Sequence, residues 1–393
     1  MTTGEMRLTG ALCLLNGALE DCDITICDES IVPSAPCAHE IDLSGYWLLP
    51  GIVDLHGDGF ERHVRPRPSA PFEKRAALQS ADVELASQGV TTAWFAQSWS
   101  WEGGSRAPDE AVALLEARRQ IAHRLMTDIR IQLRFETHMP DDHAALMAVV
   151  REYHLDYIVF NNHLPEALEM ADHRPERFAA WSAQNGHLPD DLLAIVRAAG
   201  EADPHIPAFL TGLAADLREA GVMMGSHDDP SAETRAFFRG IGASICEFPT
   251  TAEAARAAQA AGEPVLMGAP NIVRGGSQSG NVAAMELIED GLCDALISDY
   301  YIPALVQAAW VIADARALSF AHAWEMISTR PAQIMGLADR GRLAPGQRAD
   351  LVVMNPNTRR IEATIARGRI AFASGQAAQR MLRGAAPVAF AAQ

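Results

Sequence analysis

Lysine is almost absent from this chain of 393 residues. Lys74 is the only lysine, so arginine supplies nearly all of the permanent positive charge. A mechanism that needs a catalytic lysine must therefore use Lys74 or be discarded. Cysteine is scarce as well, and the six cysteines include no C-x-x-C pair, which argues against a zinc ribbon or a dithiol redox motif.

Targeting and membrane-spanning patterns are missing too. The N-terminal segment has no basic region, and Asn16 and Gly17 interrupt its apolar run, so it does not resemble a signal peptide. No stretch approaches the ~18 consecutive apolar residues of a membrane span. We therefore expect a reduced, cytoplasmic protein that has no membrane partner.

Basic charge is outnumbered by acidic charge. The chain has 50 acidic residues against 32 lysines and arginines, and its formal net charge is −18. Such a surface repels polyanions at long range, so we expect no binding to nucleic acid. A small anionic substrate remains compatible with this charge, because a local group of arginines can outweigh a distant field. The composition leaves homo-oligomerisation open.

The residues that are present indicate a large folded domain. Hydrophobic residues make up 49% and charged residues 21% of the chain, as in average soluble globular proteins. Eight short apolar runs alternate with helical patterns, which is typical of an α/β fold with a (β/α)₈ TIM-type barrel. The expected strands are Leu49–Leu55, Val90–Phe95, Ile129–Phe135, Tyr157–Phe160, Val222–Met224, Ala243–Cys246, Val265–Met267 and Ala295–Ile297. The stretch Leu164–Gly221 is too long for one crossover, and we expect two or more helices in it.

Both ends of the chain have short β patterns separated by turn residues. We predict that residues 1–48 and 341–393 form one small composite β-sandwich domain, and that residues 49–340 form the barrel. The terminal β segments are Leu8–Leu15, Ile24–Cys27, Ala38–Leu43, Ala349–Met354 and Ile361–Ile370.

Six of the eight predicted barrel strands end in side chains that can bind a metal. In a parallel barrel the catalytic groups lie at these ends, where the βα loops begin. The side chains are His56 and Asp58 after the first strand, Glu136 and His138 after the third, His163 after the fourth, His227, Asp228 and Asp229 after the fifth, Glu247 after the sixth and Asp299 after the eighth.

These residue types suit a divalent metal centre. His56 and Asp58 are two residues apart, so their side chains share one side of an extended strand. Imidazole and carboxylate ligands favour zinc, with manganese or iron as alternatives. Two bridged ions would activate a water molecule. The predicted ligands are His56, Asp58, Glu136, His163, His227 and Asp299, although His138 competes with Glu136 at its strand end.

Several longer motifs point to a family. They are LPGIVDLHGD at 49–58 with ERH at 61–63 and RPRP at 65–68, SHDD at 226–229, EFPTT at 247–251, MGAPN at 267–271 with RGG at 274–276, and SDYY at 298–301. The strand-end order H-x-D, Glu, His, His, Asp resembles the amidohydrolase superfamily. The motifs resemble one branch of it, the α-D-ribose 1-methylphosphonate 5-triphosphate diphosphatases of the carbon–phosphorus lyase pathway.

The resemblance implies a metal-dependent hydrolase in which Asp299 accepts the proton of the attacking water. Many superfamily members bridge their metals with a carbamylated lysine. Because Lys74 lies in the first predicted helix, we expect Glu136 to replace that bridge.

The chain also departs from the pattern of the resembling branch. The predicted ligands fall on strands 1, 3, 4, 5 and 8, whereas the superfamily usually uses strands 1, 4, 5, 6 and 8. The branch usually continues its histidine as H-T-P-G-Q, while residues 163–167 are HLPEA and Gln278 replaces an expected histidine.

Two segments could bind phosphate. A basic run follows the first metal motif, and a solvated charged loop is its alternative interpretation. Arg274 opens a glycine- and serine-rich loop, whose backbone amides can cradle phosphate oxygens. The predicted substrate-binding residues are Arg62, His63, Arg65, Arg67, Arg274, Gly275, Gly276 and Ser277.

The leading functional hypothesis is a hydrolase that binds two zinc ions and releases pyrophosphate from the ribose 5-triphosphate. Its partner would be a small anionic phosphorylated substrate, held by arginines. The alternative is an amidohydrolase that cleaves a C–N bond in an amide, a cyclic amide or a deaminase substrate. A metal-free binding protein would require several missing ligands, and none is missing.

Overall fold

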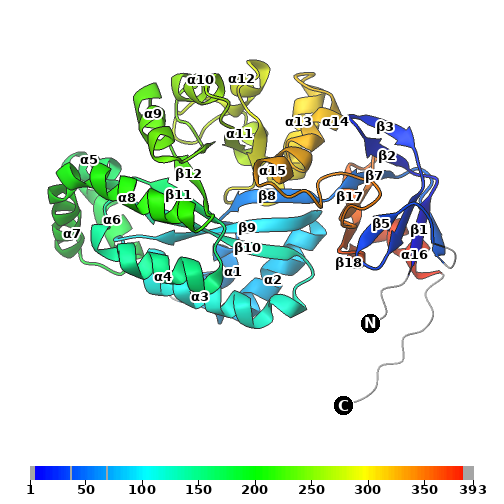
Figure 1. The fold of residues 1–393 in the computed structure, drawn as a ribbon, viewed down its shortest axis with the longest axis horizontal. Helices are drawn as coiled ribbons and strands as arrows, with labels where there is room; N and C mark the ends of the chain where they lie inside the picture. The colour runs from blue at the N-terminus through cyan, green and yellow to red at the C-terminus, as the bar shows by residue number, and fades with distance from the viewer. Residues whose placement is uncertain (1–4, 36–37, 68–69, 384–393) are drawn as a thin grey trace, which may run out of the picture.

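The computed structural model describes residues 5–35, 38–67 and 70–383. A parallel barrel forms the larger part, and two mixed sheets built from both chain ends lie at one side of it (Figure 1). The predicted α/β barrel with terminal β layers is confirmed. Parts of the β domain predicted at the two ends of the chain lie outside the described residues.

The barrel sheet contains eight parallel strands, each paired with its neighbour in the chain. All eight predicted strands are present, because each short apolar run is buried on both faces by its surroundings, as parallel strands require. The strands are β8 (Ile52–Gly57), β9 (Val90–Trp99), β10 (Asp128–Glu136), β11 (Tyr157–Asn161), β12 (Met223–His227), β13 (Ile245–Glu247), β14 (Val265–Gly268) and β15 (Ala295–Ile297).

Helices connect the strands and cover the barrel (Figure 1). They are α1 (Glu61–Val64), α2 (Lys74–Ser87), α3 (Pro108–Ile121), α4 (His143–Tyr153), α5 (Leu164–His173), α6 (Pro175–Gln184), α7 (Pro189–Glu201), α8 (Ile206–Glu219), α9 (Ala232–Ile241), α10 (Ala252–Ala260), α11 (Ala269–Arg274), α12 (Ala284–Glu289), α13 (Ala304–Asp314), α14 (Phe320–Glu325), α15 (Thr329–Ile334) and α16 (Gly375–Leu382). The long crossover between β11 and β12 holds α5 to α8, in agreement with the prediction. Within the described residues, we find no helix with the length and apolar character needed to cross a lipid bilayer.

The barrel closes between its last and first strands. The Asp54 carboxylate of β8 accepts hydrogen bonds from the Ser298 backbone N–H (2.9 Å) and hydroxyl (2.6 Å), and the Asp299 N–H donates to the His56 carbonyl (3.0 Å). A Cβ atom on Gly57 would lie 2.7 Å from the Ser298 hydroxyl oxygen. The glycine of the H-G-D motif is therefore needed for the approach of these two strands.

The chain ends form two sheets that share one apolar core. The run Leu49–Leu55, which was predicted as one strand, is divided between two strands. The strand β7 (Trp47–Pro50) belongs to a terminal sheet, and β8 belongs to the barrel. Gly51 separates the two strands, and a Cβ at this position would lie 2.4 Å from the Thr91 hydroxyl oxygen. The terminal strands are β1 (Met6–Thr9), β2 (Leu12–Leu15), β3 (Ala18–Asp21), β4 (Ile24–Cys27), β5 (Ser30–Val32), β6 (His39–Asp42), β7 (Trp47–Pro50), β16 (Leu351–Asn355), β17 (Arg360–Ala366) and β18 (Arg369–Ala373).

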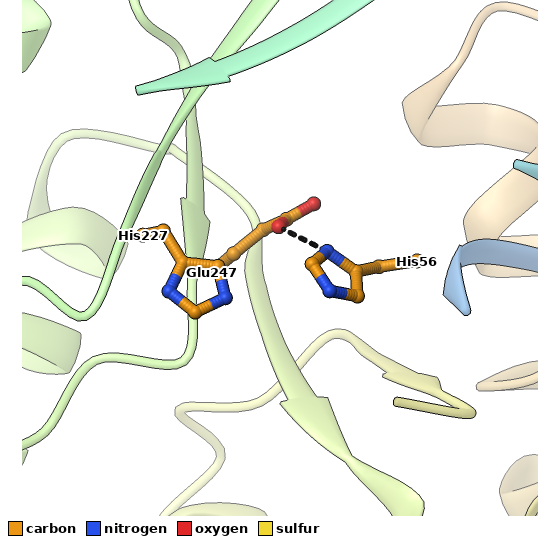
Figure 2. A group of neighbouring side chains, drawn as sticks. All are labelled: His56, His227 and Glu247. Carbon is orange, nitrogen blue, oxygen red and sulfur yellow. Dashed lines mark hydrogen bonds and ion pairs between the residues drawn. The ribbon is translucent and has the colours of Figure 1, made fainter. Parts of the chain in front are cut away.

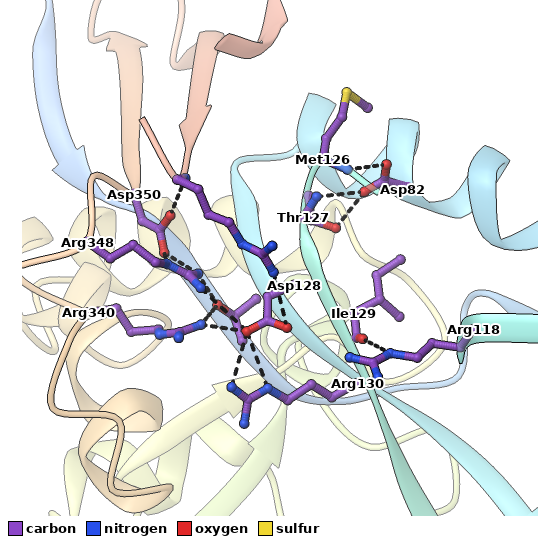
Figure 3. Close-up of polar contacts among 12 residues, drawn as sticks. Asp82, Arg118, Met126, Thr127, Asp128, Ile129, Arg130, Arg340, Arg348 and Asp350 are labelled. Carbon is purple, nitrogen blue, oxygen red and sulfur yellow. Dashed lines mark hydrogen bonds and ion pairs between the residues drawn. The ribbon is translucent and has the colours of Figure 1, made fainter. Parts of the chain in front are cut away.

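A charged cluster joins the N-terminal end of the barrel to the C-terminal part of the chain. Its centre is Asp128, the first residue of β10. Figure 3 shows the guanidinium groups of Arg130, Arg340 and Arg348 directed at this carboxylate, at 3.1, 2.8 and 3.5 Å. Burial raises the pKa of Asp128, but the charges of Arg130 and Arg340 outweigh it and hold that pKa well below its usual range.

Candidate active site

A cavity of about 560 Å³ opens at the C-terminal ends of the barrel strands. Strand-end residues and the loop after α11 both contribute to its walls. Among the predicted site residues, it is lined by Asp58, His163, His227, Arg274, Gly276, Ser277 and Asp299. The candidate ligands and one candidate phosphate loop therefore face the same space.

His56 lies at the base of this region and is almost completely buried. Its Nδ1 is 2.9 Å from Oε2 of Glu247, and its ring centroid is 5.4 Å from that of His227. Figure 2 shows these three side chains converging from β8, β12 and β13. Burial lowers the pKa of His56, but the Glu247 carboxylate outweighs this effect and raises the pKa overall.

His163 lies between two buried carboxylates. Its ring Nδ1 is 3.1 Å from Oε1 of Glu102 and also forms an ion pair with Glu136. The backbone N–H of His163 donates to Oε2 of Glu136 (3.2 Å). Burial opposes protonation, but the charge of Glu136 and the hydrogen bond to Glu102 raise the pKa of His163 to about 9. Arg106 in turn donates to both oxygens of Glu102, at 2.9 and 2.7 Å.

Three strand ends at the cavity are followed by residues with left-handed backbone conformations. Asp228 has φ 61°, Phe248 φ 50° and Asp299 φ 54°. Non-glycine residues rarely adopt this region, and such strain is found preferentially at functional sites. The Phe248 ring packs against the rings of His56 and His227, with centroid separations of 5.3 and 4.9 Å. Burial and the nearby Asp58 raise the pKa of Asp299 to about 6.

The donor chemistry of the site fits a divalent metal. Two groups of three side chains offer ligand atoms within 4.8 Å of one another: His56, His227 and Glu247, and Glu102, Glu136 and His163. Oε1 of Glu136 and Nδ1 of His163 and of His227 are buried without a hydrogen bond of acceptable geometry. They are nevertheless paired with one another or with a neighbouring carboxylate, since His163 meets Glu136 and Glu102 and His227 meets Asp228. The site therefore concentrates buried imidazole and carboxylate atoms of the kinds that bind divalent cations.

The six predicted ligands come together at one end of the barrel. Asp58, His163, His227 and Asp299 line the cavity, whereas His56 and Glu136 are buried at 1% exposure. The structure confirms the strand count, because Glu136 ends the third barrel strand and Glu247 the sixth.

His138, the competitor of Glu136, turns away from this site. Its Nε2 is 3.2 Å from Oδ1 of Asp203, its Nδ1 contacts the Thr137 hydroxyl, and it does not line the cavity.

The structure does not bring the basic run after β8 into the cavity. Arg62 and His63 both contact Glu84 of α2, and Arg65 lies 3.7 Å from Glu110 of α3. These residues form α1 or follow it, and that helix packs against α2, so their side chains meet acidic partners outside the cavity. Arg67 is exposed and does not line the cavity either.

The loop after α11 does reach the cavity. Arg274, the last residue of α11, lines its wall together with Gly276 and Ser277, and Gly275 between them caps the helix with φ 77°. The Arg274 guanidinium donates weak hydrogen bonds to the Tyr300 hydroxyl (3.3 Å) and to Oε1 of Gln278 (3.4 Å). The Arg274 side chain is exposed and therefore accessible to an anion.

Sequence reasoning missed two charged residues at the site. Arg134 of β10 lines the cavity, and its Nη1 is 3.7 Å from Oδ2 of Asp58. Its position two residues before Glu136 was a usable signal, because residues i and i+2 of a strand share a face. Glu102 lies in the loop after β9 and is completely buried, and no local pattern in the sequence marks it.

Comparison with known proteins gives one matching family model. The amidohydrolase family model matches residues 57–372. The α-D-ribose 1-methylphosphonate 5-triphosphate diphosphatase of Escherichia coli (strain K12) is 34% identical over 330 residues, which are 80% of this chain and 84% of that protein. An adenine deaminase of Brucella abortus (strain 2308) is 27% identical over 369 residues, and the chain spans about half of its length (52%).

Solved structures with the same fold have low sequence identity. A putative prolidase from Bifidobacterium longum is 15% identical with a TM-score of 0.64, over 97% of this chain and 99% of that chain. The N-acetyl-D-glucosamine-6-phosphate deacetylase from Mycobacterium smegmatis is 18% identical with a TM-score of 0.59, over 93% of this chain and 99% of that chain. These similarities concern the fold alone.

Proposed function

Because this chain belongs to the amidohydrolase family, we propose that it is a metal-dependent hydrolase that cleaves a phosphoanhydride bond. The substrate we propose is a ribose 5-triphosphate that carries a 1-methylphosphonate, and the product is pyrophosphate. The observation that supports this proposal best is that Arg274, Gly276 and Ser277 line the same cavity as the candidate ligands. The 34% identity to the Escherichia coli diphosphatase supports this substrate.

The metal ligands we propose are His56, Asp58, Glu136, His163, His227 and Asp299, with zinc first and manganese or iron as alternatives. A bound divalent ion would act as a Lewis acid and would make water a stronger nucleophile at neutral pH. We propose two ions, because His56 and His227 converge in one group of side chains, and Glu136 and His163 converge in another. Glu136 would help to hold them with its buried carboxylate, whose Oε1 meets Nδ1 of His163, another proposed ligand.

The side chains of the cavity would divide the remaining work. Arg274 is accessible and can pair with phosphate oxygens through charge-assisted hydrogen bonds. Arg134 supplies a second guanidinium deeper in the barrel, beside Asp58, where it can offset the charge of the reacting phosphate.

The bond change follows from this arrangement. A water oxygen would bond to the phosphorus next to the ribose, while the bond from that phosphorus to the bridging oxygen breaks. Pyrophosphate would leave with the bridging oxygen, and the ribose would keep one phosphate. The Asp299 carboxylate would accept the proton of the attacking water.

Phosphorus NMR tests this function directly. The metal-loaded protein is incubated with the methylphosphonate ribose triphosphate, and we expect pyrophosphate and the 5-phosphate product in equal amounts. Metal analysis by mass spectrometry on the same sample establishes that the site is loaded. Intact substrate with a fully loaded protein would contradict the proposal.

A C–N hydrolase is the second candidate, and the 27% identity to an adenine deaminase favours it. Such an enzyme would use the same ligands but would need no phosphate-binding arginine. Measuring hydrolysis of adenine, hydantoins and N-acyl amino acids beside hydrolysis of the triphosphate distinguishes the two candidates. Turnover of a C–N substrate by a protein that leaves the triphosphate intact would establish this alternative.

A further inference from the structure

The Glu247 carboxylate lies beneath the candidate active site with no exposure to solvent. Its Oε1 accepts hydrogen bonds from Nε2 of Gln132 (2.8 Å) and from the Tyr157 hydroxyl (2.5 Å). Its Oε2 is 2.9 Å from Nδ1 of His56. The three partners come from β10, β11 and β8, and each is buried, so four barrel strands meet at this one carboxylate.

These contacts leave Glu247 little capacity to bind a metal. An ionised carboxylate has about four acceptor positions, and three are used by Gln132, Tyr157 and His56. A buried carboxylate without such partners would be strongly disfavoured, so the donors account for its presence in the barrel. Glu136, by contrast, retains an oxygen without a hydrogen bond.

The orientation of the His56 ring gives a second argument. Nδ1 of His56 faces Glu247, and Figure 2 shows the other ring nitrogen on the side that faces the gap toward His227. The two nitrogens of an imidazole point in divergent directions. An ion bound at the free nitrogen would therefore be separated from Glu247 by the ring itself.

We infer that Glu247 is a positioning residue that orients His56 and is not itself a metal ligand. As an acceptor for Nδ1–H, it would fix the tautomer that leaves Nε2 unprotonated toward the metal, and it would increase the basicity of that nitrogen. The sixth strand would thus contribute to the metal centre only through His56. This inference depends on the metal centre and holds for either of the two candidate reactions.

Metal affinity tests this role without any substrate. In Glu247→Gln and Glu247→Ala, competition with a chromophoric zinc chelator should show affinity about 10–100-fold weaker than in the native chain, with the smaller loss in the glutamine variant. Both variants should still bind the native number of zinc equivalents at saturating zinc. Because no turnover is measured, a wrong substrate assignment cannot affect the result.

Cobalt substitution separates a positioning residue from a ligand. The visible absorption of protein-bound Co²⁺ reports its coordination, and we expect Glu247→Gln to keep the native band positions and intensities. A changed coordination spectrum, or one lost zinc equivalent at saturation, would show that Glu247 is a ligand. Native affinity in both variants would show that Glu247 has only a structural role, and either result overturns the inference.

Two further variants distinguish a change in zinc affinity from a general loss of stability. Tyr157→Phe removes one donor to Glu247 while preserving the ring, and it should weaken zinc affinity in the same direction but by less. Asp82→Asn is the matched control: this buried carboxylate also accepts three hydrogen bonds, from Met126 and Thr127, but contacts no imidazole. Asp82→Asn should lower the thermal midpoint and leave zinc affinity unchanged. Native zinc affinity in Tyr157→Phe would contradict the inference.

Discussion

Strand β10 begins and ends with a buried carboxylate, and the two differ in their partners. Asp128 at the N-terminal end of the barrel is contacted by guanidinium groups from Arg130, Arg340 and Arg348 (Figure 3). Glu136 at the C-terminal end contacts His163, and its Oε1 has no hydrogen bond of acceptable geometry. Permanently charged guanidinium groups surround the carboxylate at one end, whereas the carboxylate at the other end is paired with an imidazole, which can also bind a metal.

This difference indicates how the two ends are used. Breaking a buried ion pair within the chain costs about 3–5 kcal/mol, so the Asp128 cluster can hold the C-terminal segment against the barrel. Buried imidazole and carboxylate ligands gain free energy when a metal binds them, and this binding free energy contributes to folding. We therefore expect the N-terminal end to govern folding and the C-terminal end to govern metal binding and catalysis.

Glu136→Ala should have the largest effect. We expect the loss of at least one metal equivalent and a fall in turnover of about 10²–10⁴-fold, because Lewis-acid stabilisation is worth several kcal/mol. Glu136→Gln should keep the shape but weaken metal binding, and His138→Ala should be milder than either. Metal analysis and kcat measure the effects. A metal-poor His138 variant beside a fully loaded Glu136 variant would reverse this assignment.

Asp128→Asn should have the largest effect on folding. The substitution removes the buried carboxylate that three arginines share and leaves them with Asp156, Asp339 and Asp350 as their remaining acidic partners. We expect the free energy of unfolding to fall by about 3–5 kcal/mol. Urea denaturation measures this loss, and zinc affinity should remain native because the cluster lies at the other end of the barrel. A comparable loss of zinc affinity would contradict the assignment of folding to one end of the barrel and metal binding to the other.

The stability difference between the native chain and Asp128→Asn should depend on pH. The pKa of Asp128 is lowered in the folded chain, so its contribution is fully present above the unfolded-state pKa of about 3.9. It is lost as the pH falls through the lower folded-state pKa. Urea denaturation should therefore show a constant difference from pH 7 to pH 5 and a shrinking one below about pH 4. A difference that grows on acidification would contradict the assignment.

Arg274→Ala should have an intermediate effect that concerns substrate alone. A hydrogen bond to a charged group is worth about 1.5–3 kcal/mol, so we expect KM for the triphosphate to rise about 10–100-fold. Metal content should stay native, since Arg274 contacts Tyr300 and Gln278 and no candidate ligand. An unchanged KM would favour the C–N hydrolase.

Arg62→Ala should have the smallest effect. Arg62 pairs with Glu84 at the surface of α2, and its side chain is 41% exposed. Exposed pairs contribute about 0.2–1 kcal/mol, so the thermal midpoint should shift slightly and KM should remain native. A large rise in KM would restore the phosphate-binding role expected from the sequence.

Local pattern was sufficient to predict the barrel and most of its site. The eight apolar runs lie where the strands form, and all six predicted ligands lie at or just after the C-terminal ends of those strands. Parallel strands bring their C-terminal ends to one edge, so order along the chain translates into proximity. The division of Leu49–Leu55 at Gly51 is not predicted because local pattern cannot show that β7 pairs with β16 whereas β8 pairs with β9.

The sequence by itself determined the fold class and the candidate ligands at the strand ends, and it placed the only lysine, Lys74, in a helix. The tertiary structure alone decided which charges are paired. It turned Arg62 and His63 toward Glu84, directed Arg134 into the cavity, and placed Glu102 against His163. The physical reason is that strand periodicity is local, whereas the partner of a charge is selected by helices and loops far away in the chain.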